Sequence, residues 1–223
     1  MSLISLKSIN KYFRIANKRV CVLSNVTFNL SINEIIAIVG PSGSGKTSLL
    51  RVIGLLDNEN SGKVLFNGLD CNKINDRKKC YIRNSYIGFI FQSFNLLAEF
   101  NVVENIIIPQ ILSGKSYKKS FNNAYKFLKF FNINYYYHYP NQLSGGQQQK
   151  VAIIRSIANR QRLLLVDEPT GNLDKKNGDM VINLLLNIIN QFRISIILVT
   201  HNIDIANKIN KIYNLKSGKL KVF

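Results

Sequence analysis

Residues that bind metals or form disulfides are scarce in this sequence. It contains three cysteines, Cys21, Cys71 and Cys80, without any C-x-x-C spacing, and only two histidines, His138 and His201. Scattered cysteines of odd number support neither a disulfide framework nor a zinc site. Two histidines exclude a histidine-rich metal site. We therefore expect reduced thiols with a structural role.

Long apolar runs are also missing. No run approaches the roughly 20 residues that a membrane-spanning helix needs. The segment Met1–Lys11 lacks the apolar core of a signal peptide. The sequence therefore predicts a chain that stays in the cytoplasm. Its 223 residues, 46% of them hydrophobic, suit one globular domain with or without an inserted subdomain.

Acidic residues are few, with 12 Asp and Glu against 30 Lys and Arg, so the net charge is +18. A basic surface can bind nucleic acid or lie on anionic lipid headgroups. The third interpretation is compositional, because Lys, Asn, Ile, Tyr and Phe, which A- and T-rich codons encode, are all abundant. The lysines form no run of five or six. We favour the compositional interpretation, with attraction to lipid as a side effect.

One glycine-rich stretch stands out among the residues that are present. Gly40–Thr47 fits G-x-x-x-x-G-K-[ST], the pattern of a phosphate-binding loop. The apolar run 35–39 before it is typical of a buried strand, and 47–53 after it has helical spacing. Glycines let backbone N–H groups converge on one anion, Lys46 can reach the β- and γ-phosphates, and Thr47 can ligate Mg²⁺. The alternative, a glycine-rich turn without a ligand, does not explain the strand and helix around it.

The remaining pattern alternates strands with helices. Apolar runs that predict strands lie at 3–8, 20–30, 63–66, 87–91, 163–166 and 194–200, and 216–219 predicts a final hairpin. The first two predict an antiparallel sheet beside the phosphate-binding loop. Turns are expected at Asn17-Lys18 and at Asn67-Gly68. Between residues 93 and 140 apolar side chains recur at every third or fourth position, which indicates a helical insertion, and 180–189 is helical as well. Pro109 and Gly114 punctuate the insertion, and its aromatic residues, Tyr135–Tyr137 among them, are expected to pack rather than to form a ligand cage. The sequence therefore predicts an α/β fold with a parallel core.

Two acidic residues follow the apolar run 163–166. A carboxylate at the C-terminal end of such a strand lies beside the nucleotide in parallel α/β folds. Asp167 can hold Mg²⁺ through water, and Glu168 can act as the general base that polarises an attacking water. An acidic pair that merely starts a turn is the alternative, and the loop at Gly40 weighs against it.

A second anion site is predicted at Leu143–Gln147. Ser144 and Gln147 have the spacing of a capping box. The helix that follows would present a hydroxyl, glycine N–H groups and the positive end of its dipole. Two phosphate sites and one nucleotide per chain fit a head-to-tail dimer, in which each nucleotide lies between the loop of one chain and the capped helix of the other. A plain helix start is the alternative.

Together these motifs resemble the ATP-binding subunits of ABC transporters over nearly the whole chain and in the same order. The resemblance implies a P-loop NTPase (RecA-like) core with an N-terminal antiparallel β subdomain and an inserted helical subdomain at about 93–158, within a single domain 1–223. Its implied ATP-binding residues are Gly40, Pro41, Ser42, Gly43, Ser44, Gly45, Lys46, Thr47, Ser48 and Tyr12, the last stacking on adenine, with Phe13 a less favoured substitute.

The resemblance also implies roles for other residues. Glu168 would be the catalytic glutamate and His201 the switch histidine that contacts the γ-phosphate, although a strand-end histidine with a purely structural role is the alternative. Gln92 would be the Q-loop glutamine and Asp174 the D-loop residue at the dimer interface. The signature motif Leu143, Ser144, Gly145, Gly146 and Gln147 would bind the ATP of the partner subunit. Thr47, Gln92 and Asp167 would hold Mg²⁺.

The resemblance implies partners and a location too. The chain would form a homodimer, bind a separate membrane permease, and sit peripherally on the cytoplasmic face of the inner membrane, with nucleic acid not expected as a partner. The segments 89–97 and 103–105 and the Gly171-Asn172 pair resemble the branch that holds lipoprotein-release ATPases, with macrolide-exporter and cell-division ATPases as near relatives. The sequence departs from the usual pattern at Gln148-Gln149-Lys150.

Two other classes of protein remain as alternatives. A soluble scaffold ATPase of iron–sulfur assembly has a cassette of similar length, but Gly171-Asn172 and 103–105 argue against it. ABC proteins of the translation type act on nucleic acid and generally carry two cassettes, whereas this chain has one of each motif. The high positive charge is the observation that keeps this second class open.

Overall fold

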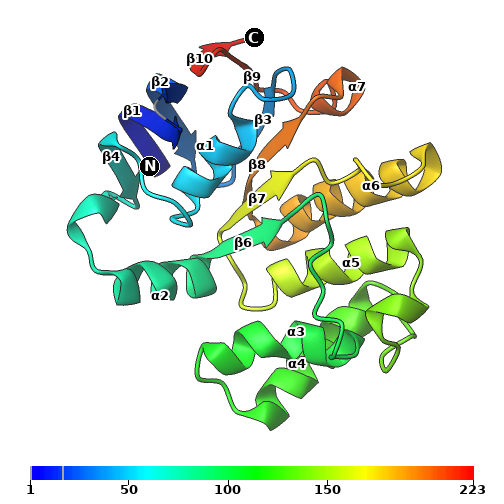
Figure 1. The fold of residues 1–223 in the computed structure, drawn as a ribbon. Helices are drawn as coiled ribbons and strands as arrows, with labels where there is room; N and C mark the ends of the chain where they lie inside the picture. Colours follow the sequence, from blue (N-terminus) through cyan, green and yellow to red (C-terminus); the bar gives the residue numbers. More distant parts are fainter. Residues whose placement is uncertain (1, 17) are drawn as a thin grey trace. The chain divides into compact units, whose positions relative to one another are not determined.

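The computed structural model describes residues 2–16 and 18–223. It divides into two compact units, which are described separately. The first unit comprises Met1–Cys80, Leu165–Glu168 and Ile194–Phe223, and the second comprises Tyr81–Leu164 and Pro169–Arg193. Figure 1 shows the elements of both units with their labels.

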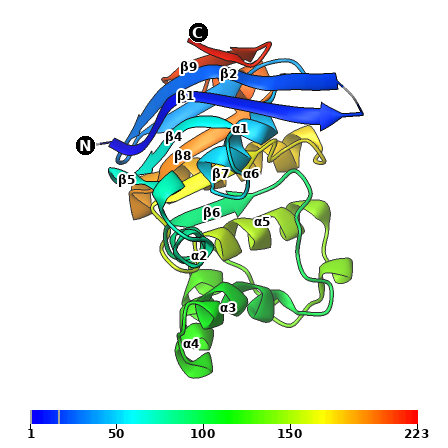
Figure 2. The same ribbon diagram turned by 60° about the vertical axis from the view of Figure 1, so that its left-hand side comes forward.

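An antiparallel sheet opens the first unit, as predicted for the N-terminal residues. Its strand order is β2-β1-β4-β5, with bounds β1 Ser2–Ile15, β2 Lys18–Ser31, β4 Ser61–Phe66 and β5 Leu69–Asp70. The hairpin of β1 and β2 is longer than predicted (Figure 2). Its register shifts between Leu6 and Ile9, where Ser8 has φ 51°, and this irregularity interrupts the alternation that marks a strand in sequence. Of the turn residues expected at Asn17-Lys18, Asn17 lies outside the described residues.

The Asn-Gly turn after residues 63–66 is confirmed. It joins β4 to β5, with φ 47° at Asn67 and φ 79° at Gly68. Positive φ at both central residues is the requirement of a type I′ hairpin turn. The sheet therefore contains four strands, although the N-terminal residues by themselves predicted two.

The parallel core of the first unit contains most of the other predicted strands. β3 (Ile35–Val39) lies parallel between β8 (Ser195–Thr200) and β9 (Ile212–Lys216), and β10 (Lys219–Val222) pairs with β9. β7 (Leu163–Asp167), whose residues 165–167 belong to this unit, adjoins β8. Every residue of β8 is buried. Helix α1 (Lys46–Ile53) packs against β2 and β8. The unit also holds the 3₁₀ helix η1 (Cys71–Lys73) and helix α7 (Ile203–Ala206), and α2 (Asp76–Tyr86) starts in it; the sequence predicted none of the three.

The prediction of structural thiols can be tested at Cys71, whose side chain is buried. Burial raises the pKa of its thiol to about 11. A thiol with such a pKa is almost entirely protonated at neutral pH and is a weak nucleophile. Cys71 therefore has the properties of a packing residue.

The second unit contains the predicted helices. After β6 (Ile87–Ile90) come α3 (Val102–Leu112), α4 (Tyr117–Phe130), η2 (Pro140–Gln142), α5 (Gly145–Ser156) and α6 (Lys175–Phe192). One core joins α3, α4 and α5, and it includes Val102, Val103, Ile106, Ile107, Ala124, Leu128, Val151 and Ile154. Tyr135 and Tyr136 pack against this core as predicted, whereas Tyr137 is exposed. Pro109, expected to punctuate the helix, lies inside α3, which ends before Gly114.

No helix in the described ranges 2–16 and 18–223 is long and apolar enough to cross a bilayer.

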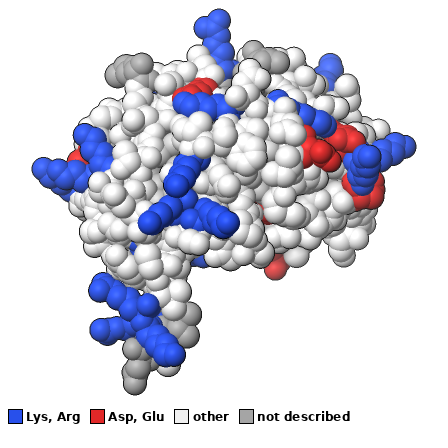
Figure 3. All heavy atoms as spheres, turned by 90° about the horizontal axis from the view of Figure 1, so that it is seen from above, with Lys and Arg blue, Asp and Glu red and all other residues white. Residues whose placement is uncertain are grey.

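Positive side chains outnumber negative ones on the face shown in Figure 3. The charge that composition predicts is therefore displayed at the surface.

Gly88 offers a test of packing in the second unit, with Gly178 as its control. A Cβ at Gly88 would lie 2.2 Å from the carbonyl oxygen of Ser156 and 2.5 Å from Leu164 Cδ2. Gly88→Ala should therefore lower the free energy of unfolding by about 1–3 kcal/mol. Gly178→Ala is the matched control, because its Cβ meets only Thr170 at 3.4 Å and Ala favours a helix by about 1 kcal/mol over Gly. Urea unfolding followed by circular dichroism should show opposite signs for the two variants; equal stabilities would contradict the packing at Gly88.

Candidate functional site

The glycine-rich loop lies between β3 and α1 in the first unit, as the phosphate-loop pattern requires. Gly43 and Gly45 have φ 76° and φ 100°, which L-residues rarely adopt. A Cβ at Gly45 would also lie 2.7 Å from the carbonyl oxygen of Val22, and one at Gly40 would lie 2.2 Å from that of Leu215. Glycine is therefore needed here both for the backbone conformation and for the close approach of two strands.

Two side chains of the loop are available to an anion. Lys46 is 8% exposed, and its Nζ donates to the carbonyl oxygens of Gly40 at 2.8 Å and Pro41 at 3.0 Å. The hydroxyl of Ser44 is buried and has no hydrogen-bond partner within the described part of the chain. A buried hydroxyl without a partner is unfavourable unless a ligand satisfies it. The loop therefore holds one cation and one unused donor where a phosphate is predicted.

The carboxylate of Asp167 lies next to this loop. It is 9% exposed, and burial raises its pKa, as does the charge of Glu168, while a hydrogen bond from the Thr47 side chain and the charge of Lys46 oppose that shift. Two adjacent carboxylates at a partly buried site favour a cation. The hydroxyl and carboxylate oxygens of Thr47 and Asp167 are the ligands that Mg²⁺ prefers. These residues therefore fit the predicted metal, and Gln92 as a third ligand stays a prediction.

Glu168 is held at both of its carboxylate oxygens. The Thr200 hydroxyl donates to Oε2 at 3.0 Å, and His201 Nδ1 lies 2.9 Å from Oε1. Because a carboxylate accepts hydrogen bonds, Nδ1 is the donor of the second contact. Glu168 has φ 44°, an uncommon conformation for a residue with a side chain, and its N–H donates to the carbonyl of Val199. The structure thus brings Glu168 and His201 together, as predicted, in a fixed orientation.

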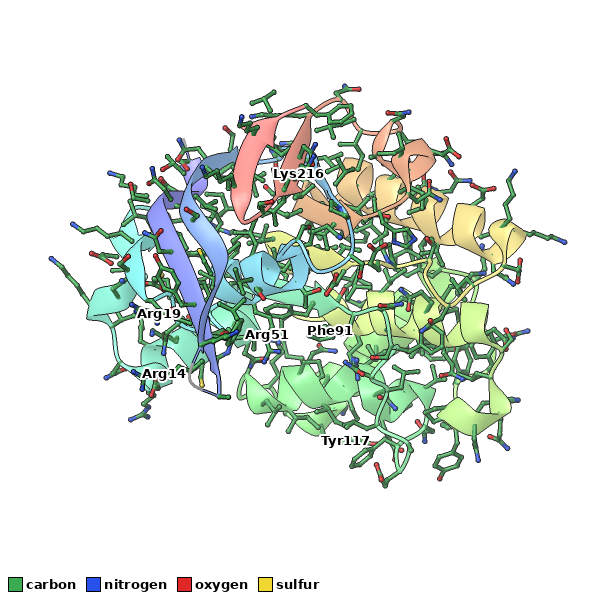
Figure 4. The ribbon with its side chains drawn as sticks, turned by 45° about the horizontal axis from the view of Figure 1, so that its top comes forward. Arg14, Arg19, Arg51, Phe91, Tyr117 and Lys216 are labelled. Atoms are coloured by element: carbon green, nitrogen blue, oxygen red, sulfur yellow. The ribbon has the colours of Figure 1, made fainter. Side chains whose placement is uncertain are left out.

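Tyr12 lies on β1 in the same unit. Its N–H donates to Asn60 Oδ1 at 2.7 Å, and the guanidinium of Arg19 lies 4.4 Å from the centroid of its ring. Figure 4 labels Arg19 near the end of the β1–β2 hairpin. A cation over an aromatic face is attracted to it, so Arg19 covers one of the two faces of the ring. Stacking of a base on Tyr12 stays a prediction.

The predicted capping box is present at the start of α5 in the second unit. Ser144 N–H donates to Gln147 Oε1 at 2.8 Å, and Gln147 N–H donates to Ser144 Oγ at 3.4 Å. A Cβ at Gly145 would lie 3.3 Å from Leu173 Cδ2, and one at Gly146 would lie 2.8 Å from Asn177 Oδ1. Bare glycine backbone and a helix N-terminus together make an anion site.

Asp174 caps the start of α6. Asn177 N–H donates to Asp174 Oδ1 at 3.0 Å, and Asn177 Nδ2 donates to the other carboxylate oxygen. These hydrogen bonds hold the pKa of Asp174 below its ordinary value. Asn177 therefore contacts both Gly146 and Asp174. The position of Asp174 at a dimer interface stays a prediction.

Gln92 lies beside the Gly171-Asn172 pair that the sequence singled out. The Asn172 side chain donates to the carbonyl oxygen of Gln92 at 3.0 Å, and a Cβ at Gly171 would lie 2.9 Å from Gln92 Nε2. Glycine therefore leaves room for the glutamine side chain. The amide of Asn172 fixes the backbone at the same residue.

Four further residues hold predicted site residues within their own units: Thr200 in the first, and Asn105, Arg155 and Asn177 in the second. The sequence suggested no structural role for them, although Asn105 lies in the segment 103–105. Thr200 and Asn177 have been described. Asn105 is fully buried and accepts from Leu97 N–H at 2.9 Å, and Arg155 donates to the carbonyl oxygens of Phe94 and Asn95. Together, Asn105 and Arg155 fix the segment after Gln92. An Asn and an Arg, each within an apolar helical run, were the available sequence signals.

Comparisons with known proteins agree with these motifs. The model of a family described as ABC transporter matches residues 23–171. The chain is 42% identical to the lipoprotein-releasing system ATP-binding protein LolD of Rickettsia typhi, over 97% of this chain and 96% of that protein. It is 37% identical to the LolD of Wigglesworthia glossinidia brevipalpis, over 99% and 96%.

Solved structures have the same fold. A dimeric, post-hydrolysis structure of the ATP-binding cassette MJ0796 bound to ADP and Pi superposes with a TM-score of 0.89 at 35% identity, covering 98% of this chain and 96% of that one. The structure of cbiO1 from Clostridium perfringens, described as part of the ABC transporter complex cbiONQ, gives a TM-score of 0.86 at 24% identity, over 99% of this chain and 87% of that one. The second likeness supports the fold alone.

Proposed function

The chain belongs to the ABC transporter family, whose cassettes couple ATP hydrolysis to transport, and we propose that the transport it drives is the release of lipoproteins from the inner membrane. The relatives named LolD support this cargo, because their identity to the chain extends over nearly its full length. The segments 89–97 and 103–105 and Gly171-Asn172 point to the same branch.

ATP binding follows from the loop of the first unit. The N–H groups of residues 40–48, the Ser44 hydroxyl and the Lys46 ammonium would surround the phosphates. Tyr12 would stack on adenine with Arg19 behind it. Thr47 and Asp167, with Gln92, would hold Mg²⁺, which neutralises phosphate charge when bound. The unused donor on Ser44 is the observation that supports an anion at this position.

Hydrolysis would depend on Glu168. A general base must present one oxygen to a water while its orientation stays fixed. Thr200 and His201 hold the two carboxylate oxygens separately, and this double contact is the observation that carries the proposal. Glu168 would accept the proton of the attacking water, and His201, 68% exposed at its side chain, would remain free to reach the γ-phosphate with its other nitrogen.

The chain works as a homodimer with a membrane permease as partner, consistent with the dimeric cassette structures and the LolD relatives. In the dimer, Leu143–Gln147 of one subunit would bind the phosphates held by the loop of the other. The permease would be of the LolC/LolE kind. The chain would accordingly lie on the cytoplasmic face of the inner membrane as a peripheral subunit.

Thr200 gives a test of the catalytic geometry. Thr200→Val keeps the shape of the side chain but removes the hydrogen bond to Glu168, together with the one that the hydroxyl accepts from Asn202 N–H. A hydrogen bond to a charged group is worth about 1.5–3 kcal/mol, so ATP turnover should fall roughly tenfold or more. Thr200→Ser, which retains the hydroxyl, is the control and should stay close to the unmodified rate. Phosphate release measures both, and an unaffected valine variant would show that Thr200 does not position Glu168.

The transport proposal is tested in cells. The tagged chain is purified from detergent-solubilised membranes and its partners are identified by mass spectrometry. We expect a permease with few spans and a large extracytoplasmic domain, and we expect lipoproteins to accumulate in the inner membrane when the chain is depleted. A permease of this kind without lipoprotein accumulation would favour an exporter or division role. Recovery of soluble partners or RNA alone would overturn the transport proposal while leaving the ATPase chemistry intact.

A further inference from the structure

One stretch of the chain lacks acidic residues altogether. Residues 105–166 contain nine Lys and Arg and no Asp or Glu, so nine of the net +18 charges lie in this stretch. A uniformly A- and T-rich composition raises lysine everywhere, but it does not by itself remove every carboxylate from one segment. The distribution of charge is therefore a second observation, separate from its amount.

The lysines of α4 lie on one face of the helix. Lys118, Lys119, Lys126 and Lys129 are exposed, and at 3.6 residues per turn they span an arc of about 100°. The buried residues Ser120, Ala124 and Leu128 project from the opposite side. We call these four residues the α4 lysine face.

Exposed aromatic rings flank this face. On the same helical projection Tyr125 lies at one edge of the lysine arc and Phe130 at the other, with exposures of 44% and 51%. Tyr117, at the start of α4, is 61% exposed and points away from the ribbon in Figure 4. Leu112, the last residue of α3, is 75% exposed.

The positive charges of the α4 lysine face have no acidic residue beside them in the stretch 105–166. Within the described residues none of the α4 lysines forms an ion pair. Lys115, next to the helix, donates to the amide oxygen of Asn159. Burial lowers the pKa of Lys115, and the charges of Lys119 and Arg160 lower it further. Cations that repel one another in this way are stabilised when an external anion binds.

We propose that the α4 lysine face binds the anionic headgroups of a lipid bilayer directly. An amphipathic surface of lysines beside tyrosine, phenylalanine and leucine suits the boundary between headgroups and acyl chains. The exposed tyrosine and phenylalanine rings could also stack on bases, but the exposed aliphatic Leu112 could not, so the mixed aromatic and aliphatic surface favours lipid over nucleic acid. The inference rests on the proposed function in placing the chain at a membrane, but it requires no permease.

Vesicle binding by the full-length chain tests the proposal without a permease. Sedimentation is compared for vesicles of phosphatidylcholine and for vesicles with 30% phosphatidylglycerol by design, roughly the anionic share that attracts basic segments. The test variant carries Lys→Gln at Lys118, Lys119, Lys126 and Lys129. The control variant carries Lys→Gln at four exposed lysines of the first unit, Lys7, Lys63, Lys219 and Lys221, and therefore has the same net charge.

We expect the unmodified chain to bind the anionic vesicles and to be released by salt. The test variant should bind at least about tenfold more weakly, and the control less than about threefold, if local charge governs attraction. Equal losses in both variants would overturn the proposal, because net charge alone would then explain binding. The proposal would also be overturned if the unmodified chain did not bind the anionic vesicles. It would be overturned too if the test variant lost binding to RNA but not to vesicles. ATP turnover of the test variant should be unchanged, so the proposed function is judged separately.

Discussion

Glu168→Gln should abolish ATP turnover while leaving ATP binding intact. The substitution retains the size and polarity of the side chain but removes its ability to accept a proton from water. A general base contributes about 10²–10⁴ to a rate, so the residual rate should be at least a hundredfold lower. Because the nucleotide is then bound and not cleaved, the dimer should become long-lived. Phosphate release and size-exclusion chromatography with ATP measure the two effects.

The matched control is Glu99→Gln, which makes the same chemical change at an exposed glutamate of the second unit. It should hydrolyse ATP at the unmodified rate and dissociate normally. Rapid hydrolysis by the Glu168 variant would remove Glu168 from the role of base. A variant that neither hydrolyses nor binds ATP would point to a structural defect at the left-handed φ of this residue. A lower melting temperature than that of the unmodified chain would identify such a defect.

Lys46→Ala should weaken ATP binding strongly. The ammonium group is 8% exposed and is already directed at loop carbonyls of Gly40 and Pro41, so it needs little reorganisation to meet a phosphate. A hydrogen bond to a charged group is worth about 1.5–3 kcal/mol, which corresponds to a loss of roughly 10- to 150-fold in affinity. Titration with a fluorescent ATP analogue measures the dissociation constant.

Arg51→Ala is the control for this variant, since Arg51 is an exposed cation on the same helix α1 (Figure 4). Its removal changes the net charge equally and should alter affinity little. Inorganic triphosphate used as a competitor separates contacts with phosphate from contacts with adenine. If the Lys46 variant bound ATP as tightly as the unmodified chain, the phosphate-loop assignment would be wrong.

Features that depend on neighbouring residues could be predicted from the sequence. The loop at Gly40, the capping box of Ser144 and Gln147, and the Asn67-Gly68 turn each lie within a few residues, and each is present. The buried strands followed from short apolar runs in the same way. The long β1–β2 hairpin was only partly predicted, because the irregularity near Ser8 breaks the alternation on which strand prediction depends.

Contacts between distant residues could not be predicted in this way. Thr200 and Glu168 are 32 residues apart, and Arg155 meets the carbonyl of Asn95 across 60 residues. A threonine at the end of a strand, or an arginine in an apolar helix, has many structural uses. Only the folded chain shows which carboxylate or carbonyl each of them reaches.

The position of the Asn177 side chain links the starts of two helices. Asn177 lies against Gly146 at the start of α5 and hydrogen-bonds the carboxylate of Asp174 at the start of α6. The Asn177 side chain therefore lies between the first turns of both helices. A methyl group at Gly146 would displace the Asn177 side chain and break its hydrogen bond to Asp174, whereas the Asn177 N–H would still donate to the other carboxylate oxygen. The starts of α5 and α6, which sequence motifs treat as separate, are therefore coupled through one side chain. A substitution at either start should shift the other without altering a backbone hydrogen bond.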